Sequence, residues 1–172
     1  MAGLLDNILG KPYTLGELMK VDQGRQDRAA KCTVHLDDTF YTLKEETPLS
    51  KFKNLFTKNT LKVFYITLKL AVTSDTGNTH YVYIQIDPDF SLTDWAENRV
   101  KIYCDCADFM YRSAYLLDKR DSLFKNEWIK GTLGQAMTEE PKGKRGVTLL
   151  CKHSFAAFQW LMANYKQIMS TL

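Results

Sequence analysis

Alternating apolar and polar residues in the middle of the chain predict a β-hairpin. The strongest run covers residues 61–73, which is rich in β-branched and aromatic residues, and residues 80–87 alternate in the same way. Between them lie Gly77 and Asn78, which both tolerate a positive φ and favour a tight turn. We therefore expect two antiparallel strands joined by a turn at residues 74–79.

Upstream of this hairpin the pattern is less regular. Residues 32–43 also alternate, but Asp37 and Asp38 interrupt the alternation. This pattern predicts either a pair of strands or one bent strand. Residues 44–60 are polar and rich in lysine, with a few apolar residues at helical spacing, namely Phe52, Leu55 and Phe56.

Helical periodicity dominates the C-terminal half. A short strand is expected at residues 100–104, followed by a helix over 107–120 whose apolar residues recur every three or four positions. The same spacing predicts a final helix over 153–169. Between the helices lies an insertion, 121–148, whose end is expected to form a short strand at 147–150.

The first 30 residues predict an arm of two short helices. Apolar residues within 4–9 make one helical face, and Thr14 with Glu17 fits a capping box that starts a second helix. The polar stretch 22–29 is expected to be a loop. Two interpretations stay open: the short helices pack on the body of the protein, or they dock on a partner chain.

Together these elements predict an α+β fold. Its central part is antiparallel and β-rich, its C-terminal part is a strand-helix/strand-helix unit, and a short helical arm precedes both. We expect the arm at residues 1–30, the β part at 31–98 and the C-terminal part at 99–172, the last two forming one compact domain.

Composition narrows the class of protein. A chain of 172 residues with 45% hydrophobic and 25% charged residues is typical of a globular domain. The net charge of +3 is too small for a dedicated nucleic-acid-binding domain. No signal peptide is expected at the first residues, and no apolar run is long enough for a membrane span. We therefore expect a reducing compartment, in which closely spaced cysteines are interpreted as metal ligands in preference to disulfides.

Two tripeptides carry the candidate chemistry. Cys104 and Cys106 form one pair at i and i+2, and Cys151 and His153 form another, with 44 residues between the tripeptides. Residues at i and i+2 of an extended strand point to the same side. Three thiolates and one imidazole are a ligand set that tetrahedral zinc prefers. We predict a zinc site, structural because four protein ligands leave no open position; the alternative is that these are buried free cysteines.

Residues near these pairs have simpler interpretations. Asp105 and Asp108 are expected to cap the helix that follows, although an outer-shell role at the metal stays open. Cys32 and His35 cannot chelate together from one strand, so Cys32 is expected in the core. His80 is expected at the surface.

A basic run in the insertion is the other candidate for a contact. Lys142, Lys144 and Arg145 could touch phosphate or a partner, but such runs are more often solvated loops.

The order Cys-x-Cys, spacer, Cys-x-His resembles the SWIM-type zinc-binding motif over about residues 99–165, although the spacer here is longer than in most members. The fuller patterns Cys104-Asp105-Cys106-Ala107-Asp108-Phe109 and Leu150-Cys151-Lys152-His153 are similar to those of tailed-bacteriophage virion proteins. The resemblance implies a structural Zn²⁺ at the four ligands and contacts with other proteins of a symmetric assembly.

These observations lead to one expected function and two competitors. We expect a non-enzymatic structural component of a tailed-phage virion (tail, baseplate or neck), assembled in the host cytoplasm, with no small-molecule substrate. The alternative is a cytoplasmic SWIM-type adaptor that binds nucleic acid or protein; nucleic acid is possible but not favoured. An enzyme has the least support because the chain contains no catalytic triad, calcium loop or phosphate-binding loop pattern.

Overall fold

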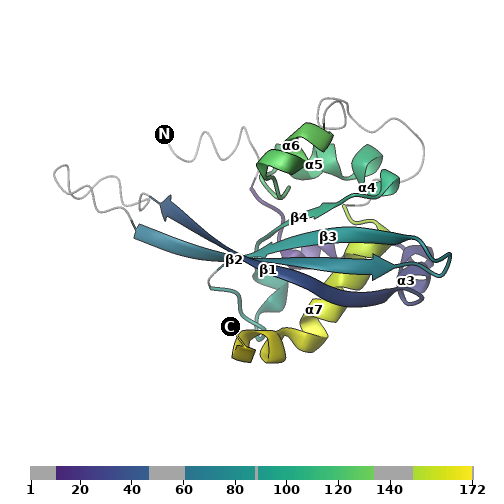
Figure 1. The fold of residues 1–172 in the computed structure, drawn as a ribbon, viewed down its shortest axis with the longest axis horizontal. Helices are drawn as coiled ribbons and strands as arrows, with labels where there is room; N and C mark the ends of the chain where they lie inside the picture. The colour runs from purple at the N-terminus through teal and green to yellow at the C-terminus, as the bar shows by residue number, and fades with distance from the viewer. Residues whose placement is uncertain (1–10, 47–60, 88, 134–148, 172) are drawn as a thin grey trace.

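An antiparallel sheet forms the centre of the protein (Figure 1). The computed structural model describes residues 11–46, 61–87, 89–133 and 149–171. Each strand pairs with the next one in sequence, so the order is β1-β2-β3-β4. The strands are β1 (Thr33–Glu46), β2 (Leu61–Thr73), β3 (Thr79–Ile86) and β4 (Val100–Cys104). With helices packed on this sheet, the predicted α+β class is confirmed.

The predicted hairpin forms between β2 and β3. Gly77 takes φ +83° in the turn, a left-handed conformation that glycine adopts without steric cost. Asn78 has no positive φ, so only one of the two expected positions uses this freedom. β1 is one bent strand, because its register on β2 shifts between Leu36 and Asp38, which leaves Asp37 as an extra residue.

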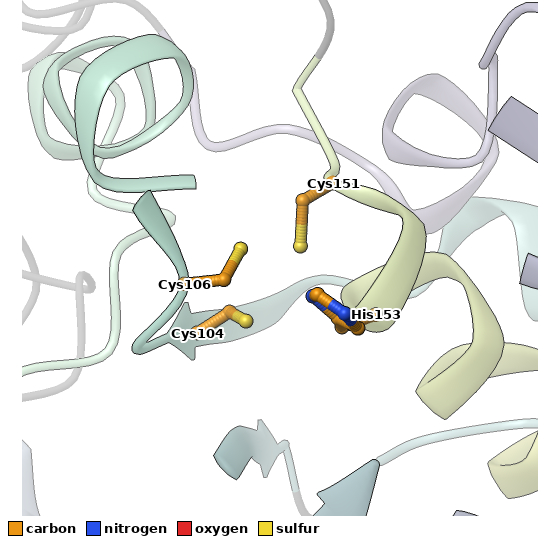
Figure 2. Close-up of side chains that lie close together, drawn as sticks. All are labelled: Cys104, Cys106, Cys151 and His153. Carbon is orange, nitrogen blue, oxygen red and sulfur yellow. The ribbon is translucent and has the colours of Figure 1, made fainter. Parts of the chain in front are cut away.

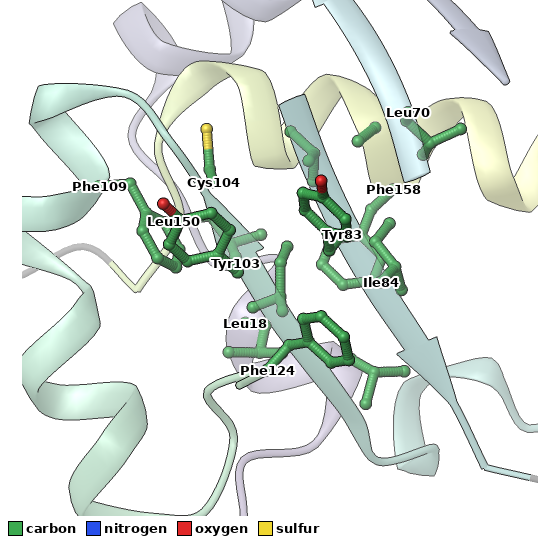
Figure 3. Close-up of a cluster of buried hydrophobic side chains, with 14 of the residues drawn as sticks. Leu18, Leu70, Tyr83, Ile84, Tyr103, Cys104, Phe109, Phe124, Leu150 and Phe158 are labelled. Atoms are coloured by element: carbon green, nitrogen blue, oxygen red, sulfur yellow. The ribbon is translucent and has the colours of Figure 1, made fainter. Parts of the chain in front are cut away.

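The long helix α7 (Lys152–Thr171) packs on the sheet and contacts all four strands. Leu68, Ile84 and Ile102 lie in one cross-strand row, so their side chains share a face of the sheet. All three are fully buried, and so is Phe158 of α7, which Figure 3 shows with Ile84 in one buried cluster. The predicted helix over 153–169 is confirmed and extends slightly at both ends.

The opposite face is covered along β3 and β4 by the segment that follows β4. This segment holds α4 (Ala107–Arg112), α5 (Ala114–Lys119) and α6 (Glu127–Leu133). The ring of Tyr83 stacks on Phe124 with centroids 5.7 Å apart, and Tyr103 meets Phe109 edge-on at 5.9 Å. The sheet is therefore buried on both faces at β3 and β4.

The single helix predicted over 107–120 is wrong. The chain bends at Ser113, whose φ of −106° lies outside the usual helical range, and α4 and α5 are separate helices. The backbone bonds on either side persist, from Ser113 N to Phe109 O and from Leu117 N to Ser113 O. The bend is therefore a local distortion at a buried serine.

The N-terminal part packs on the body. In α2 (Leu15–Leu18) the predicted capping box is confirmed: Glu17 N donates to Thr14 Oγ1 and Thr14 N donates to Glu17 Oε2. Leu15 and Leu18 are fully buried. Gly16 lets α2 approach the short helix η1 (Trp95–Glu97).

Two other expectations are corrected. The predicted loop at 22–29 is a helix, α3 (Gln23–Ala29), because the Asp22 carboxylate caps it by accepting from Arg25 N and its inner side packs on α7. Residues 149 and 150 form a bend and not the expected strand. The rest of the range 147–150 lies outside the described residues. The helix expected at 4–9 and the polar stretch 47–60 also lie outside them. Within the described part of the chain, no helix is long and apolar enough to cross a membrane.

Candidate metal centre

The four predicted ligands meet where β4 ends and α7 begins. Cys104 is the last residue of β4, and Cys106 lies at the start of α4. Cys151 directly precedes α7, and His153 lies in its first turn. Figure 2 shows the four side chains converging, and their ligand atoms all lie within 4.8 Å of one another. The cluster is positioned to bind a metal ion.

Local backbone geometry explains why the sulfurs point inward. Cys106 is the N-cap of α4, and its Sγ accepts from Phe109 N at 3.4 Å. The Sγ of Cys151 likewise accepts from Ser154 N at 3.3 Å at the start of α7. Backbone N–H groups at a helix start lack partners within the helix, so a thiolate there is stabilised. Each metal-ligand pair therefore also begins a helix.

The cluster is buried and fits a metal. All four residues are buried. Both ring nitrogens of His153 are buried, and neither finds a hydrogen-bond partner in the described part of the chain. An unpaired buried nitrogen is costly unless it binds a ligand. Sulfurs at about 2.3 Å from a tetrahedral zinc lie ~3.8 Å apart, so a slight contraction of this cluster would complete the coordination.

The cluster shifts the pKa values of its three thiols in different directions. Burial raises the pKa of Cys104 well above its usual value, and hydrogen bonds with the other two thiols raise it further. At Cys106 a hydrogen bond with Cys104 lowers the pKa, but contact with Cys151 and burial raise it more. Burial also raises the pKa of Cys151, yet hydrogen bonds from Cys104 and Cys106 outweigh burial and bring it well below its usual value. Of the three thiols, Cys151 is therefore the one whose deprotonated form the cluster favours.

Asp105 and Asp108 do not cap α4, contrary to expectation, because Cys106 occupies the cap. The Asp105 carboxylate lies 2.9 Å from His80 Nδ1 and accepts from Tyr81 N at 3.1 Å. His80 in turn packs on the ring of His153 with centroids 4.4 Å apart. The expected surface position of His80 is corrected: it is half-buried, between Asp105 and the ring of His153. His80 pairs with Val72 on β2. Two residues later in β3, Val82 pairs with Cys104 of β4, so His80 lies at the end of the sheet where the cluster is.

Arg25 ties three elements together around the centre. Its Nη1 donates to Leu150 O at 2.7 Å and to Asp108 Oδ2 at 3.0 Å, while Asp108 Oδ1 lies 3.1 Å from Arg112 Nε. These bonds connect α3 and α4 to the residue before Cys151. Arg25 was not foreseen because its segment was expected to be a loop; the Asp22 cap three residues earlier was the available signal.

Other predicted residues lie elsewhere. Cys32 packs against the core but is only half-buried, with its Sγ 3.6 Å from Arg28 O, and His35 is exposed. Neither belongs to the cluster, as the strand geometry predicted. Lys142, Lys144 and Arg145 lie outside the described residues.

Comparison with protein-family models, with curated proteins and with solved structures finds no match. The metal-binding arrangement therefore rests on the geometry of the four side chains. The SWIM and phage resemblances stay predictions from the sequence.

Proposed function

We propose that the cluster binds a structural zinc ion. The donor set favours this metal, because three thiolates and an imidazole suit tetrahedral zinc and disfavour calcium or magnesium, which prefer oxygen ligands. Four protein ligands fill the coordination sphere, so no position is left for water or substrate. This argues for a structural and not a catalytic ion.

The ion would hold the C-terminal part of the protein together. Cys104 and Cys106 belong to the junction of β4 and α4, whereas Cys151 and His153 belong to the start of α7. A metal bond between these junctions fixes α4 and α7 on opposite sides of one centre. It also closes the chain segment between them, which lowers the entropy of the unfolded state.

We propose further that the protein is a structural component of a tailed-phage virion, in its tail, baseplate or neck, and acts through contacts with other virion proteins. The observation that carries this proposal is an exposed apolar surface on a projecting part of the sheet. We call this part the distal ribbon: residues 40–46 of β1 and 61–66 of β2. Pairing between β2 and β3 ends at Ile66 and Ile86, so beyond that row only two strands remain (Figure 1).

The distal ribbon continues the core face of the sheet beyond its cover. Leu68 is fully buried, but Phe64, four residues along the same face of β2, is 61% exposed. Across from it on β1, Leu43 is 47% exposed, and Tyr41, which pairs with Ile66 on the same face, is 58% exposed. A two-stranded ribbon is only marginally stable in water, and contiguous exposed apolar side chains mark interaction sites. These properties support a role in which the ribbon is covered by a neighbouring protein.

Two measurements test this function. Native mass spectrometry of the purified chain is expected to find one zinc ion per chain, and an intact metal-free protein would refute the zinc proposal. Quantitative mass spectrometry of purified particles from the encoding genome is expected to find the chain in a fixed, multiple copy number. Its absence from such particles would refute the virion role even if zinc is bound.

The distal ribbon is tested in the same particles. Tyr41→Ser and Phe64→Ser are expected to reduce incorporation strongly. Tyr111→Ser is the matched control, because Tyr111 lies on α4 and is 76% exposed away from the ribbon. Equal incorporation of all three variants would show that the ribbon is not the contact surface.

A further inference from the structure

A pocket of about 490 Å³ lies beside the metal centre. It is bordered by α3, by the start of α4 and by the start of α7. Three cluster residues, Cys106, Cys151 and His153, form its floor. The rest of its polar wall is contributed by Arg25, Arg28, His80, Asp108, Arg112 and Lys152.

The charge of this wall is strongly positive. Four cationic side chains face one carboxylate, that of Asp108, so the described lining residues carry an excess of +3 with His80 neutral. A zinc ion with three thiolates and a neutral imidazole would contribute −1, which leaves the pocket at +2. The positive charge therefore persists when the metal centre is filled.

The cations are only partly neutralised. Asp108 is shared between Arg25 and Arg112, and Arg25 Nε also lies 3.4 Å from Asp22 Oδ2, outside the lining. Lys152 has its nearest carboxylate, Asp75, at the long distance of 3.8 Å. Arg28 forms no ion pair with any described residue. Charge in this pocket is therefore available to an anionic ligand.

One of the cations is held rigidly. Arg25 is 5% exposed, and its bonds to Leu150 O and Asp108 fix the guanidinium in place. A preorganised guanidinium loses little entropy when it binds an anion, and its geometry matches the oxygens of a phosphate. Arg25 thus forms the rigid part of the pocket, and the exposed Arg28 and the partly exposed Lys152 are its other two cations beside Arg112.

We infer that this pocket binds a phosphate group, carried either by a small phosphate or nucleotide or by a single-stranded nucleic acid. The volume lies within the range of about 300–1,000 Å³ that small-molecule sites occupy, so it admits more than a bare ion. The positive excess of the lining residues, which Asp22 and Asp75 offset in part, suits a phosphate, with its one or two negative charges, better than a single carboxylate. The inference goes beyond the proposed virion role and does not depend on it.

The test measures binding of the zinc-loaded chain to three probes at low salt: inorganic phosphate, a mononucleotide, and a fluorescent single-stranded oligonucleotide. Calorimetry follows the small probes and fluorescence anisotropy follows the oligonucleotide. Competition by phosphate or the mononucleotide would assign the pocket to a small ligand. Binding of the oligonucleotide alone would assign it to a nucleic-acid backbone.

The double variant Arg28→Gln, Lys152→Gln is expected to weaken binding at least tenfold. With the oligonucleotide, the slope of log affinity against log salt should fall by about 1.4, because each single-strand phosphate contact contributes about 0.7. The control is Lys166→Gln, which removes one positive charge about 21 Å further along α7 than Lys152. Metal content is measured in every variant, so a loss of zinc is distinguished from a loss of phosphate contact.

Three results would overturn the inference. One is that none of the probes binds the wild-type chain at low salt. Another is that the double variant, with its zinc retained, binds as tightly as wild type. The third is that Lys166→Gln weakens binding as much as the double variant, which would mean a diffuse charge effect and no pocket.

Discussion

Replacing Cys151 by serine is expected to remove the metal and destabilise the C-terminal part of the protein. Cys151 is fully buried, and its Sγ accepts from Ser154 N at the start of α7. The metal crosslink between Cys106 and Cys151 closes a loop of roughly 45 residues, which corresponds to about 4 kcal/mol in the chain-entropy model. A domain of this size is stable by about 5–15 kcal/mol, so the loss is a large fraction of the total.

The assay is guanidinium unfolding of wild type and Cys151→Ser, each with bound zinc and again with a chelator present. We expect a difference of about 4 kcal/mol in the free energy of unfolding with zinc present, and a much smaller difference in chelator, where both proteins lack the crosslink. Cys32→Ser is the matched control: Cys32 is half-buried and outside the cluster, so its change should cost less than about 1 kcal/mol.

Hydrogen exchange gives the location of the effect. Amides of residues 121–133 and 149–171 should lose protection in Cys151→Ser, whereas the hairpin of β2 and β3 should keep it, because its bonds do not involve the four cluster residues. Two results would refute the reasoning: a Cys151→Ser protein that still holds one zinc per chain, or a chelator that destabilises it as much as it destabilises wild type.

Two further predictions concern packing. Phe158→Ala should lower the free energy of unfolding by about 3–5 kcal/mol, because it empties a fully buried site. Phe64→Ala on the exposed distal ribbon should cost less than about 1 kcal/mol. Equal losses in chemical denaturation would contradict the assignment of Phe158 to the core. Gly24→Ala should stabilise α3 by about 0.5 kcal/mol, but Gly16→Ala should show no such gain, since its Cβ would lie 3.1 Å from the carbonyl oxygen of Ala96; similar gains in thermal unfolding would show that η1 moves aside.

Local patterns in the sequence were sufficient for most elements and for the metal ligands. The alternation in residues 61–73 and 80–87 predicted β2 and β3, and Thr14 with Glu17 predicted the start of α2. The two i, i+2 pairs identified all four members of the cluster. These features depend on residues within one strand or turn, so their physical causes are contained in short stretches of sequence.

What surrounds the ligands was decided by the tertiary structure. His80 meets His153 because the register of β3 on β2 and β4 sets it on the α7 face of the sheet at the end where Cys104 lies. Arg25 reaches Leu150 and Asp108 only because α3 packs on α7. Each of these contacts joins residues 25 or more positions apart, whose approach depends on strand order and helix packing.

The distal ribbon shows the same division. Alternation alone predicts that Phe64 and Leu68 lie on one face of β2, and both follow the same apolar pattern. Only the structure shows that Leu68 is buried while Phe64 is exposed. The sequence alone therefore determined which side chains share a face and which could bind a metal. The three-dimensional packing decided which of those faces are buried, because burial depends on the length and position of the elements that cover them.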